Sequence, residues 1–515
     1  MVLPRKMNSR TTVERSFLIR RLTTITLCMM VFVCGYLMIS DVMGDSSEIN
    51  DKRNLSLFEQ RRTQQILNHQ NVVIRDNQEE EKQSLLKKMR DWDVPNGVHS
   101  HQNGDTNKER QKKTIEVDLD DKSPSSPLQI LLSAKVHLID IYPDQRKMLH
   151  VTDDNTYAGV DAIFCQLDFS QQRKDPSSVP MFRYVVAHSP GCEFGPQYKV
   201  DLKGFADLAR IHDAEVSTGD LPKSLNLTGV VFHESRCGST LVANALVAMN
   251  PSEHRVFSES SPPISAMRNV CGENLQFCSV KQAAAVLKDV MYLMGRSDNG
   301  QEKRVFFKIQ SVGSLSIKIF QLAYPNIPWL YVYRDPVQVM MSHLQGYDVT
   351  SPMGVRNANC VQGRRRGGKI LARHVEQRTS FASINDLTDI QYCAAHLATL
   401  TQSAADSIEE SFSTTLPSKL MGRAINYEDL PAALWKSALP DHFGLGTLSE
   451  VTIKRIQDIS GVYSKGTRGR HGEFKEDSES KERKATPEIR DAAETFLQES
   501  YERLLKYGFD GIRRL

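Results

Sequence analysis

The sequence carries almost no excess of charge of either sign. Its 65 Lys and Arg residues nearly balance its 62 Asp and Glu residues, which leaves a net charge of +3 over 515 residues. Proteins that bind nucleic acid along a large surface carry a clear basic excess, so this balance argues against such a role. With 40% hydrophobic and 25% charged residues, the chain is also not collagen-like, fully disordered or a small disulfide scaffold. Its length is enough for about three domains.

Two motifs of common enzyme classes are absent as well. No Gly-x-x-x-x-Gly-Lys-Ser/Thr loop occurs, which argues against P-loop kinases and nucleoside triphosphatases because these need the loop lysine. No Gly-x-Ser-x-Gly elbow occurs, which leaves nucleophilic hydrolases poorly supported. A kinase or NTPase therefore stays only as an alternative, which metal-dependent activity would revive.

One long apolar run lies near the N-terminus. Residues 22–40 contain no charged side chain, and as a helix they nearly span a hydrocarbon core of about 30 Å. Residues 1–21 hold six Lys or Arg and one Glu, whereas acidic residues follow the run. We predict a cytoplasmic tail (1–21), a transmembrane signal anchor (22–40) and a luminal remainder, which is a single-pass type II topology. A cleaved signal peptide is the alternative, but no small-x-small site follows the run.

The segment after the anchor, residues 41–127, is polar and rich in charge. Such a composition predicts a largely disordered luminal stalk. Seven cysteines lie beyond the anchor, where an oxidising lumen allows disulfides, and Cys271 with Cys278 is the only pair close in sequence. Two glycosylation sequons begin at Asn54 and Asn226. These features indicate a head that the stalk holds away from the membrane.

The head changes its pattern at about residue 226. Residues 128–225 hold three short β-like runs, LQILL, VHLIDIY and MFRYVVAHS, and we expect a β-rich addition of unknown role or extra strands of the main sheet. From 226 to 515, strand-like runs alternate with helical patterns. This alternation predicts an α/β fold, a P-loop-like three-layer sandwich with a central parallel sheet. Ligands of such sheets bind beyond the carboxyl ends of the strands.

The first candidate site follows a predicted strand directly. The turn SRCGST, residues 235–240, leads from this strand into an amphipathic helix. Backbone N–H groups and the positive dipole at the helix start form an anion site, which Gly238 lets a ligand approach closely. Arg236 would add a fixed cation, and Ser239 and Thr240 would add hydroxyl donors. The alternative is an ordinary strand-to-helix turn.

The second candidate site follows the strand predicted at 329–333. Arg334 leaves the strand end, and Asp335 with Pro336 suits the start of a helix, which we predict over 336–344. Ser342 follows about two helical turns later, so Arg334 and Ser342 would clamp a second phosphate group. The alternative is an ion pair between Arg334 and Asp335 or another carboxylate. Two anion loops without a Walker lysine suggest a ligand with separated phosphates and no catalytic metal.

Together the two loops resemble the sulfotransferase family that uses 3′-phosphoadenylyl sulfate (PAPS). SRCGST is similar to the family's loop for the 5′-phosphosulfate, and RDPVQVMMS (334–342) to its segment for the 3′-phosphate. The continuation of the first loop looks like that of Golgi tyrosylprotein and carbohydrate sulfotransferases. In those enzymes a Glu follows the loop helix, and Glu259 is the matching residue here. Lys308 matches a lysine of the tyrosylprotein enzymes, and the segment YEDL (427–430) is also similar. The resemblance covers residues 228–510.

The resemblance implies a catalytic role for three side chains. In sulfuryl transfer, charge builds on the bridging oxygen of the leaving nucleotide, where fixed cations and donors act. Arg236 and Lys308 would supply these, with the loop backbone at 238–240. Glu259 would act as the general base that takes the acceptor proton, against the alternative of a structural Glu. Rival bases are His233, His254 and Glu234.

The resemblance also implies which residues hold PAPS as co-substrate, with no metal expected. The set is Arg236, Cys237, Gly238, Ser239, Thr240, Arg334 and Ser342. In the first loop, Ser235 and Cys237 depart from the commoner Pro and Ser of the family. Cys237 would be enclosed by the phosphosulfate, so we expect it to stay outside any disulfide, and the other six luminal cysteines remain to pair.

The acceptor stays open between a sugar hydroxyl and a protein tyrosine, and the first loop is slightly closer to the tyrosylprotein type. A basic run between Arg364 and Arg378 suits an acidic glycan or peptide, with a solvated basic loop as the equal alternative. Segment 465–484 is expected to be merely charged and mobile. The resemblance implies a location in the Golgi membrane, and it leaves open whether the protein forms a homodimer. A non-catalytic, membrane-tethered glycan- or peptide-binding protein on the same fold is the second alternative, although the two anion clamps argue against it.

Overall fold

The described part of the chain belongs to one compact unit, Glu109–Leu515. A computed structural model describes residues 113–216, 220–272, 275–347, 354–356, 358–361, 371, 375, 383–414, 420–463, 472–473 and 477–509. The predicted tail, the predicted anchor and the predicted stalk as far as residue 112 therefore lie outside the described residues. Within the described ranges, no helix is both long and apolar enough to cross a membrane.

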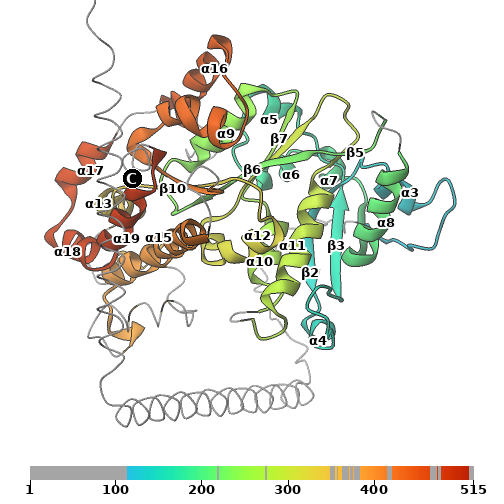
Figure 1. Ribbon diagram of the computed structural model, residues 1–515, viewed down its shortest axis with the longest axis horizontal. Helices are drawn as coiled ribbons and strands as arrows, with labels where there is room; N and C mark the ends of the chain where they lie inside the picture. Colours follow the sequence, from blue (N-terminus) through green and yellow to red (C-terminus); the bar gives the residue numbers. More distant parts are fainter. Residues whose placement is uncertain are drawn as a thin grey trace, which may run out of the picture. The chain divides into compact units, whose positions relative to one another are not determined.

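A five-stranded parallel sheet lies at the centre of this unit (Figure 1). Its strands occur in the spatial order β11-β10-β6-β9-β7, and every neighbouring pair is parallel. Their bounds are Asn226–His233 (β6), His254–Ser258 (β7), Arg304–Lys308 (β9), Trp329–Tyr333 (β10) and Gly422–Asn426 (β11). The predicted α/β class with a central parallel sheet is confirmed.

Helices cover both faces of the parallel sheet (Figure 1). Val230 and Phe232 of β6 pack into one hydrophobic cluster, and Val231 between them packs into another on the opposite face. A strand that is buried on both faces has a continuous apolar sequence, which is why β6 and β10 could be predicted from the sequence. The covering helices are α11 (Val280–Met294), α12 (Ile317–Ala323) and α15 (Asp389–Thr414) on one face, and α9 (Ser239–Met249) and α16 (Glu450–Ser460) on the other.

A second, four-stranded sheet is built from the residues before 202. Its order is β1-β4-β3-β2, antiparallel except for the parallel pair β1–β4. The strands are β1 (Thr114–Glu116), β2 (His137–Pro143), β3 (Val160–Cys165) and β4 (Gln197–Asp201). Leu138 and Phe164 of this sheet lie in the same hydrophobic cluster as Phe257 and Trp329 of the parallel sheet. The two sheets therefore share one core.

Two of the three predicted β-like runs are helices. LQILL forms α3 (Pro127–Leu132), and MFRYVVAHS contains α6 (Phe182–Ala187), whereas VHLIDIY is β2 as predicted. In α3, Ser126 caps the first turn and Pro127 occupies its first position, which favours a helix over a strand. The region forms a sheet of its own and does not extend the parallel sheet.

The remaining elements mostly surround these two sheets. Helix α13 has the predicted bounds Pro336–Leu344. Short strands pair as β5 (Lys223–Ser224) with β8 (Arg296–Ser297) and β12 (Val462–Tyr463) with β13 (Gly472–Glu473). The other helices are α4 (Gln145–Leu149), α5 (Ser170–Lys174), α7 (Pro190–Glu193), α8 (Leu202–Glu215), α10 (Ser261–Arg268), α17 (Ser478–Lys484), α18 (Pro487–Phe496) and α19 (Gln498–Lys506), with 3₁₀ turns at Ser311–Ser316, Ile384–Asp386 and Tyr427–Asp429 and a π-helix at Leu434–His442.

Six of the cysteines form three disulfides. The sequence left every pairing open, and the disulfides are Cys165–Cys192, Cys271–Cys278 and Cys360–Cys393. Cys237 stays outside any disulfide, as expected.

Candidate functional site

The five parallel strands end at one edge of the sheet. Val332 of β10 pairs with His233 of β6, and Ser258 of β7 pairs with Lys308 of β9. The segments that follow these strands therefore start side by side. They include the turn 235–240 and the segment that begins with Arg334. The structure thus brings the two predicted anion loops together at the carboxyl edge, where ligands of parallel sheets bind.

The turn 235–240 has an unusual backbone. Ser235, Arg236 and Gly238 adopt positive φ angles of 89°, 57° and 85°. Side chains other than glycine rarely adopt this region, and such conformations persist where a site requires them. At Gly238 a Cβ atom would also lie 2.8 Å from the Tyr427 ring, so only glycine fits there. The surrounding fold therefore holds the turn in this one conformation.

Cys237 is outside every disulfide for a different physical reason from the one expected. Its side chain is fully buried in the cluster between β6 and α9, and its Sγ donates to the carbonyl of Val332 at 3.0 Å. The thiol thus faces the core beneath the turn. A ligand at the outer side of the turn would meet the backbone of Cys237 and not its sulfur.

The hydroxyls of Ser239 and Thr240 occupy the first turn of α9. The two residues are 0% and 5% exposed, and their Oγ atoms have no hydrogen-bond partner among the residues that the structure describes. Buried donors without partners are unfavourable, and a helix N-terminus favours an anion. An anion bound here would satisfy both hydroxyls and the free backbone N–H groups at once.

Glu259, Lys308 and His233 form a second cluster at the same edge. Glu259 follows β7 directly with a φ of 56°, and its backbone N–H donates to the Lys308 carbonyl at 2.7 Å. The Lys308 ammonium is ion-paired with Oε1 of Glu259, and Nε2 of His233 lies 3.6 Å from the same oxygen. Lys308 is 1% exposed, so this carboxylate compensates a buried cation. Lys308 and Glu259, which are 49 residues apart in sequence, are thus in direct contact, as their predicted roles at one site require.

Two of the rival bases lie elsewhere. His254 is the first residue of β7, at the opposite end from Ser258, and its Nδ1 contacts the Leu246 carbonyl at 2.8 Å. Burial lowers the pKa of His254. Glu234 is 1% exposed and accepts the backbone N–H of Arg334 at 3.1 Å, and burial raises its pKa well above the usual range. Of the three rivals, only His233 adjoins Glu259.

Arg334 is buried and held from several sides. It is 4% exposed, its Nε donates to Gln338 at 3.0 Å, and its guanidinium lies 4.0 Å from the centre of the Tyr427 ring. Its Nη2 donates to Ser478 Oγ at 2.9 Å and to Asp477 Oδ1 at 3.2 Å. Arg334 therefore does pair with a carboxylate, but with Asp477 and not with its neighbour Asp335.

Ser342 lies on the same helix as Gln338, one turn further on. It is 6% exposed, and its hydroxyl donates to the Gln338 carbonyl at 2.9 Å. Asp335 caps this helix by accepting the Gln338 N–H at 3.0 Å. Arg334 and Ser342 are thus connected through Gln338, and the Ser342 hydroxyl is bonded within its own helix.

Lys481 is a residue of this site that the sequence did not reveal. The expectation that segment 465–484 is merely charged and mobile is wrong for its described part, because Ser478–Lys484 forms α17 against α13. Lys481 is 7% exposed and its Nζ contacts Asp477 at 2.6 Å. Burial lowers the pKa of Lys481, and the charges of Arg334 and Arg236 act in the same direction. Lys481 therefore lies within electrostatic reach of both Arg334 and Arg236.

Other predicted features are not placed by the structure. The basic run from Arg364 to Arg378 lies outside the described residues. Within the described ranges, no group of three or more His, Cys, Asp or Glu side chains is arranged to hold a metal ion.

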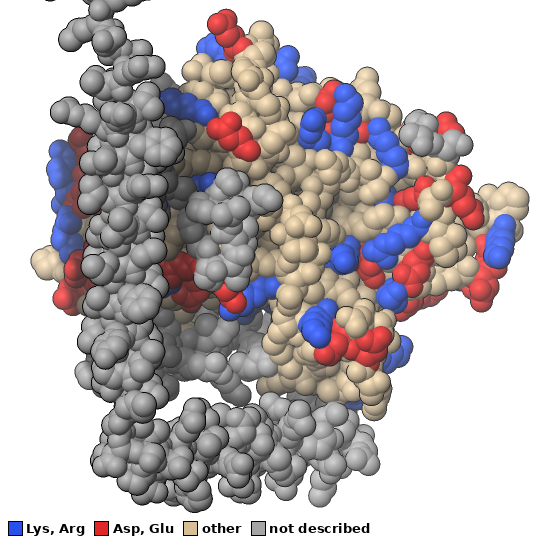
Figure 2. All heavy atoms as spheres, viewed as in Figure 1, with Lys and Arg blue, Asp and Glu red and all other residues tan. Residues whose placement is uncertain are grey.

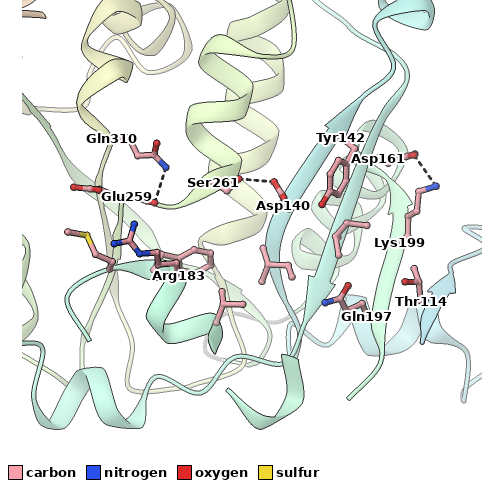
Figure 3. Close-up of a pocket in the computed structure, with 15 residues that line it drawn as sticks. Thr114, Asp140, Tyr142, Asp161, Arg183, Gln197, Lys199, Glu259, Ser261 and Gln310 are labelled. Carbon is pink, nitrogen blue, oxygen red and sulfur yellow. Dashed lines mark hydrogen bonds and ion pairs between the residues drawn. The ribbon is translucent and has the colours of Figure 1, made fainter. Parts of the chain in front are cut away.

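A cavity of about 790 Å³ adjoins the Glu259 cluster. Glu259, Ser261 and Gln310 line one part of it, and the four-stranded sheet lines another with Asp161 and Lys199 (Figure 3). The region to which the sequence assigned no chemistry is therefore one wall of a pocket that reaches the predicted general base.

Known proteins offer one structural likeness. No family model matches this chain, and no curated protein matches it. Among solved structures, the "Sulfotransferase Domain from the Curacin Biosynthetic Pathway" is similar to it, with 15% sequence identity and a TM-score of 0.28. The match covers 53% of this chain and 98% of that domain. A likeness at this level carries no argument about activity, so function has to be argued from the residues at the site.

Proposed function

We propose that this protein transfers a sulfuryl group from PAPS to a hydroxyl of a glycan or a protein tyrosine. The observation that carries the proposal is the meeting, at one sheet edge, of an anion-binding turn with the Lys308–Glu259 pair. The turn offers a phosphosulfate a helix N-terminus and two buried hydroxyls that have no partner among the described residues. Arg334, with Lys481 nearby, offers a second cationic position for a 3′-phosphate.

The chain's own residues account for each part of the reaction. Glu259 takes the proton of the acceptor hydroxyl as its oxygen forms a bond to sulfur. The bond between sulfur and the bridging phosphate oxygen breaks, and the electron pair leaves on that oxygen as adenosine 3′,5′-bisphosphate. Lys308 and Arg236 stabilise the charge that develops there, because fixed cations need no reorganisation during the reaction.

The sequence supports placing this reaction in the secretory pathway. The apolar run at 22–40, its basic flank and the three disulfides suit a type II Golgi protein with a luminal head. Fractionation of cells that express the full chain, with protease protection of the C-terminal part in sealed vesicles, tests this location. Cleavage of that part in intact vesicles would contradict it.

Binding of adenosine 3′,5′-bisphosphate tests the nucleotide assignment. We expect the full-length protein, purified in detergent with a metal chelator, to be stabilised by about 2.7 kcal/mol when the bisphosphate is present at 100 times its Kd. Arg334→Ala should lose most of this stabilisation. A magnesium-dependent preference for ATP would reject the proposal in favour of a kinase or NTPase. A folded protein that binds neither nucleotide would favour a non-catalytic binding protein.

A further inference from the structure

One face of the four-stranded sheet, which carries most of its polar side chains, lines the cavity beside Glu259. Asp161 of β3 faces the cavity, whereas the next residue, Ala162, is buried in the core. Gln197 and Lys199 of β4 also face the cavity, and Tyr198 between them is buried. Because side chains alternate across a strand, the same face of two strands belongs to the cavity. The other face of this sheet supplies the hydrophobic core.

The charges around the cavity do not suit an acidic ligand. They comprise three carboxylates and two cations: Asp140, Asp161, Glu259, Arg183 and Lys199. Lys199 already pairs with Asp161 at 3.1 Å and with Glu116 at 3.2 Å, so its charge is largely compensated. On the face drawn in Figure 2, acidic and basic side chains are likewise interspersed. Glu259 likewise pairs with Lys308, so the charges nearly balance. A sulfated or uronic-acid glycan, or an acidic peptide, would therefore find no excess of positive charge here.

The remaining lining combines polar groups, which suit a ligand with many hydroxyls, with apolar side chains such as Ile163 and Phe182. Planar carboxylate and amide groups can each bond two neighbouring hydroxyls, and Gln197 and Gln310 offer both donors and acceptors. The ring of Tyr142 is 56% exposed at the cavity, where it offers an apolar face and a hydroxyl to a sugar ring. A volume of about 790 Å³ lies in the upper part of the range for small-molecule sites and exceeds what one tyrosyl side chain fills.

Part of this lining is already fixed in position. Ser261, which begins α10, donates to Asp140 Oδ1 at 2.8 Å, and the Ile141 N–H donates to the same oxygen at 2.9 Å. Gln310 donates to the Glu259 carbonyl at 3.3 Å (Figure 3). These bonds connect the four-stranded sheet to the Glu259 segment. A ligand held by the sheet would therefore lie at a defined position relative to Glu259.

We propose that this cavity binds an uncharged oligosaccharide as the acceptor and presents one of its hydroxyls to Glu259. This inference rests on the proposed sulfuryl transfer, and it chooses a glycan over a protein tyrosine. Tyr142 and Gln197 contact the sugar rings, and Asp161 bonds their hydroxyls. The four-stranded sheet thereby selects the acceptor, whereas the parallel sheet holds the nucleotide.

Direct binding tests the acceptor class. The full-length protein in detergent is saturated with adenosine 3′,5′-bisphosphate and titrated by calorimetry with three kinds of probe. These are neutral glycans (chitotetraose, maltotetraose and N-acetyllactosamine), a chondroitin sulfate tetrasaccharide, and an acidic peptide that contains one tyrosine. We expect a neutral glycan to bind most tightly. Tyr142→Ala and Gln197→Ala should each weaken that binding about tenfold, since each removes about 1.4 kcal/mol of contact.

Phe194→Ala is the control. Phe194 is an aromatic residue that is 72% exposed but does not line the cavity, so its loss should leave glycan binding unchanged. Thermal unfolding of each variant confirms that it folds. Tighter binding of the peptide or the acidic tetrasaccharide, no glycan binding at all, or glycan binding that Tyr142→Ala and Gln197→Ala leave intact would each overturn the inference.

The bisphosphate titration separates this inference from the proposed function. Failure of the folded protein to bind the bisphosphate would reject the nucleotide site. Bisphosphate binding without binding of any neutral glycan would reject only the acceptor class and leave sulfuryl transfer as proposed.

Discussion

The five-stranded and the four-stranded sheet offer ligands different surfaces. The parallel sheet buries both faces, so the polar groups that a ligand could meet lie where strands end, as at Lys308 and Arg334. The four-stranded sheet buries one face and lines a cavity with the other, so its polar groups alternate along the strands, as at Gln197 and Lys199. A site at strand ends therefore forms compact sequence motifs, whereas a site on a sheet face is spread over separate strands.

The largest expected effect tests whether the two sheets are one cooperative unit. Glu302 is fully buried and pairs with Arg255 of the parallel sheet and, at 2.6 Å, with Arg173 of α5. Glu302→Ala leaves the buried Arg255 uncompensated, so we expect about 3–5 kcal/mol less stability. Urea unfolding followed by tryptophan fluorescence and by far-UV circular dichroism measures this loss.

The outcome of that experiment decides how the two sheets are related. Coincident transitions by both probes, shifted together in Glu302→Ala, would support one shared core. Two separate transitions would contradict the conclusion that the two sheets share one core. Glu253→Ala is the control, because Glu253 pairs with Lys303 and Arg304 at a partly exposed position where ion pairs contribute only about 0–1 kcal/mol.

The second prediction concerns the end of β9. Lys308→Ala removes the buried cation that we place at the leaving oxygen, so we expect kcat to fall about 10²–10³-fold while the Kd for adenosine 3′,5′-bisphosphate changes little. Release of the bisphosphate from PAPS in the presence of acceptor measures kcat. Lys303 is an exposed lysine just before the start of the same strand, so Lys303→Ala should keep full activity. A Lys308→Ala enzyme with normal kcat would remove Lys308 from the reaction.

The sequence predicted the parallel sheet well because its strands are apolar on both faces. The run at 329–333 and the helix at 336–344 were predicted with their observed bounds. β7 was missed, since three of the five residues in its sequence HRVFS are polar. His254 and Arg255 are nonetheless buried, because a backbone carbonyl and Glu302 compensate them over long sequence distances. Such compensation leaves no local pattern.

The four-stranded sheet was predicted less well for a related reason. Short apolar runs such as LQILL do not distinguish a strand from a helix by their period. The Ser126–Pro127 pair before α3 was the signal that would have decided it. The cavity that the sheet lines depends on which strands lie side by side. Lys481 was missed likewise, because its neighbour Arg334 is far away in sequence and only the tertiary fold brings them together.

The third prediction separates the two surfaces by their arginines. Arg334→Ala should weaken bisphosphate binding about 10–100-fold, because charge-assisted hydrogen bonds contribute about 1.5–3 kcal/mol. Arg183→Ala, on the cavity wall, should leave that Kd unchanged and alter acceptor KM instead. Calorimetry with the bisphosphate and initial rates with the acceptor measure the two effects. If Arg183→Ala weakened binding of the nucleotide, the assignment of nucleotide binding to one sheet and acceptor binding to the other would be wrong.

The smallest expected effect lies beneath the parallel sheet's edge, at Glu234. Burial raises the pKa of this carboxyl well above its usual range, and one of its oxygens has no hydrogen-bond partner among the described residues. A raised pKa in the folded state means that the unfolded chain loses the proton first. This contribution to stability is therefore complete below the unfolded pKa and declines as pH rises toward the folded value.

Glu234→Gln removes this titration and keeps an oxygen to accept the Arg334 N–H. We expect the variant to match the wild type near pH 4.5 and to be more stable at neutral pH by about 1 kcal/mol or more, since one pKa unit corresponds to about 1.4 kcal/mol. Urea unfolding at several pH values measures the difference. Glu253→Gln should behave in the opposite way. The hydrogen bond from Lys303 lowers the pKa of this partly exposed carboxyl. The stability that Glu253 contributes is therefore present above its unfolded pKa and is lost as the pH falls. Equal pH profiles for wild type and Glu234→Gln would mean that Glu234 is ionised in the folded protein, as the charge of Arg334 alone would favour.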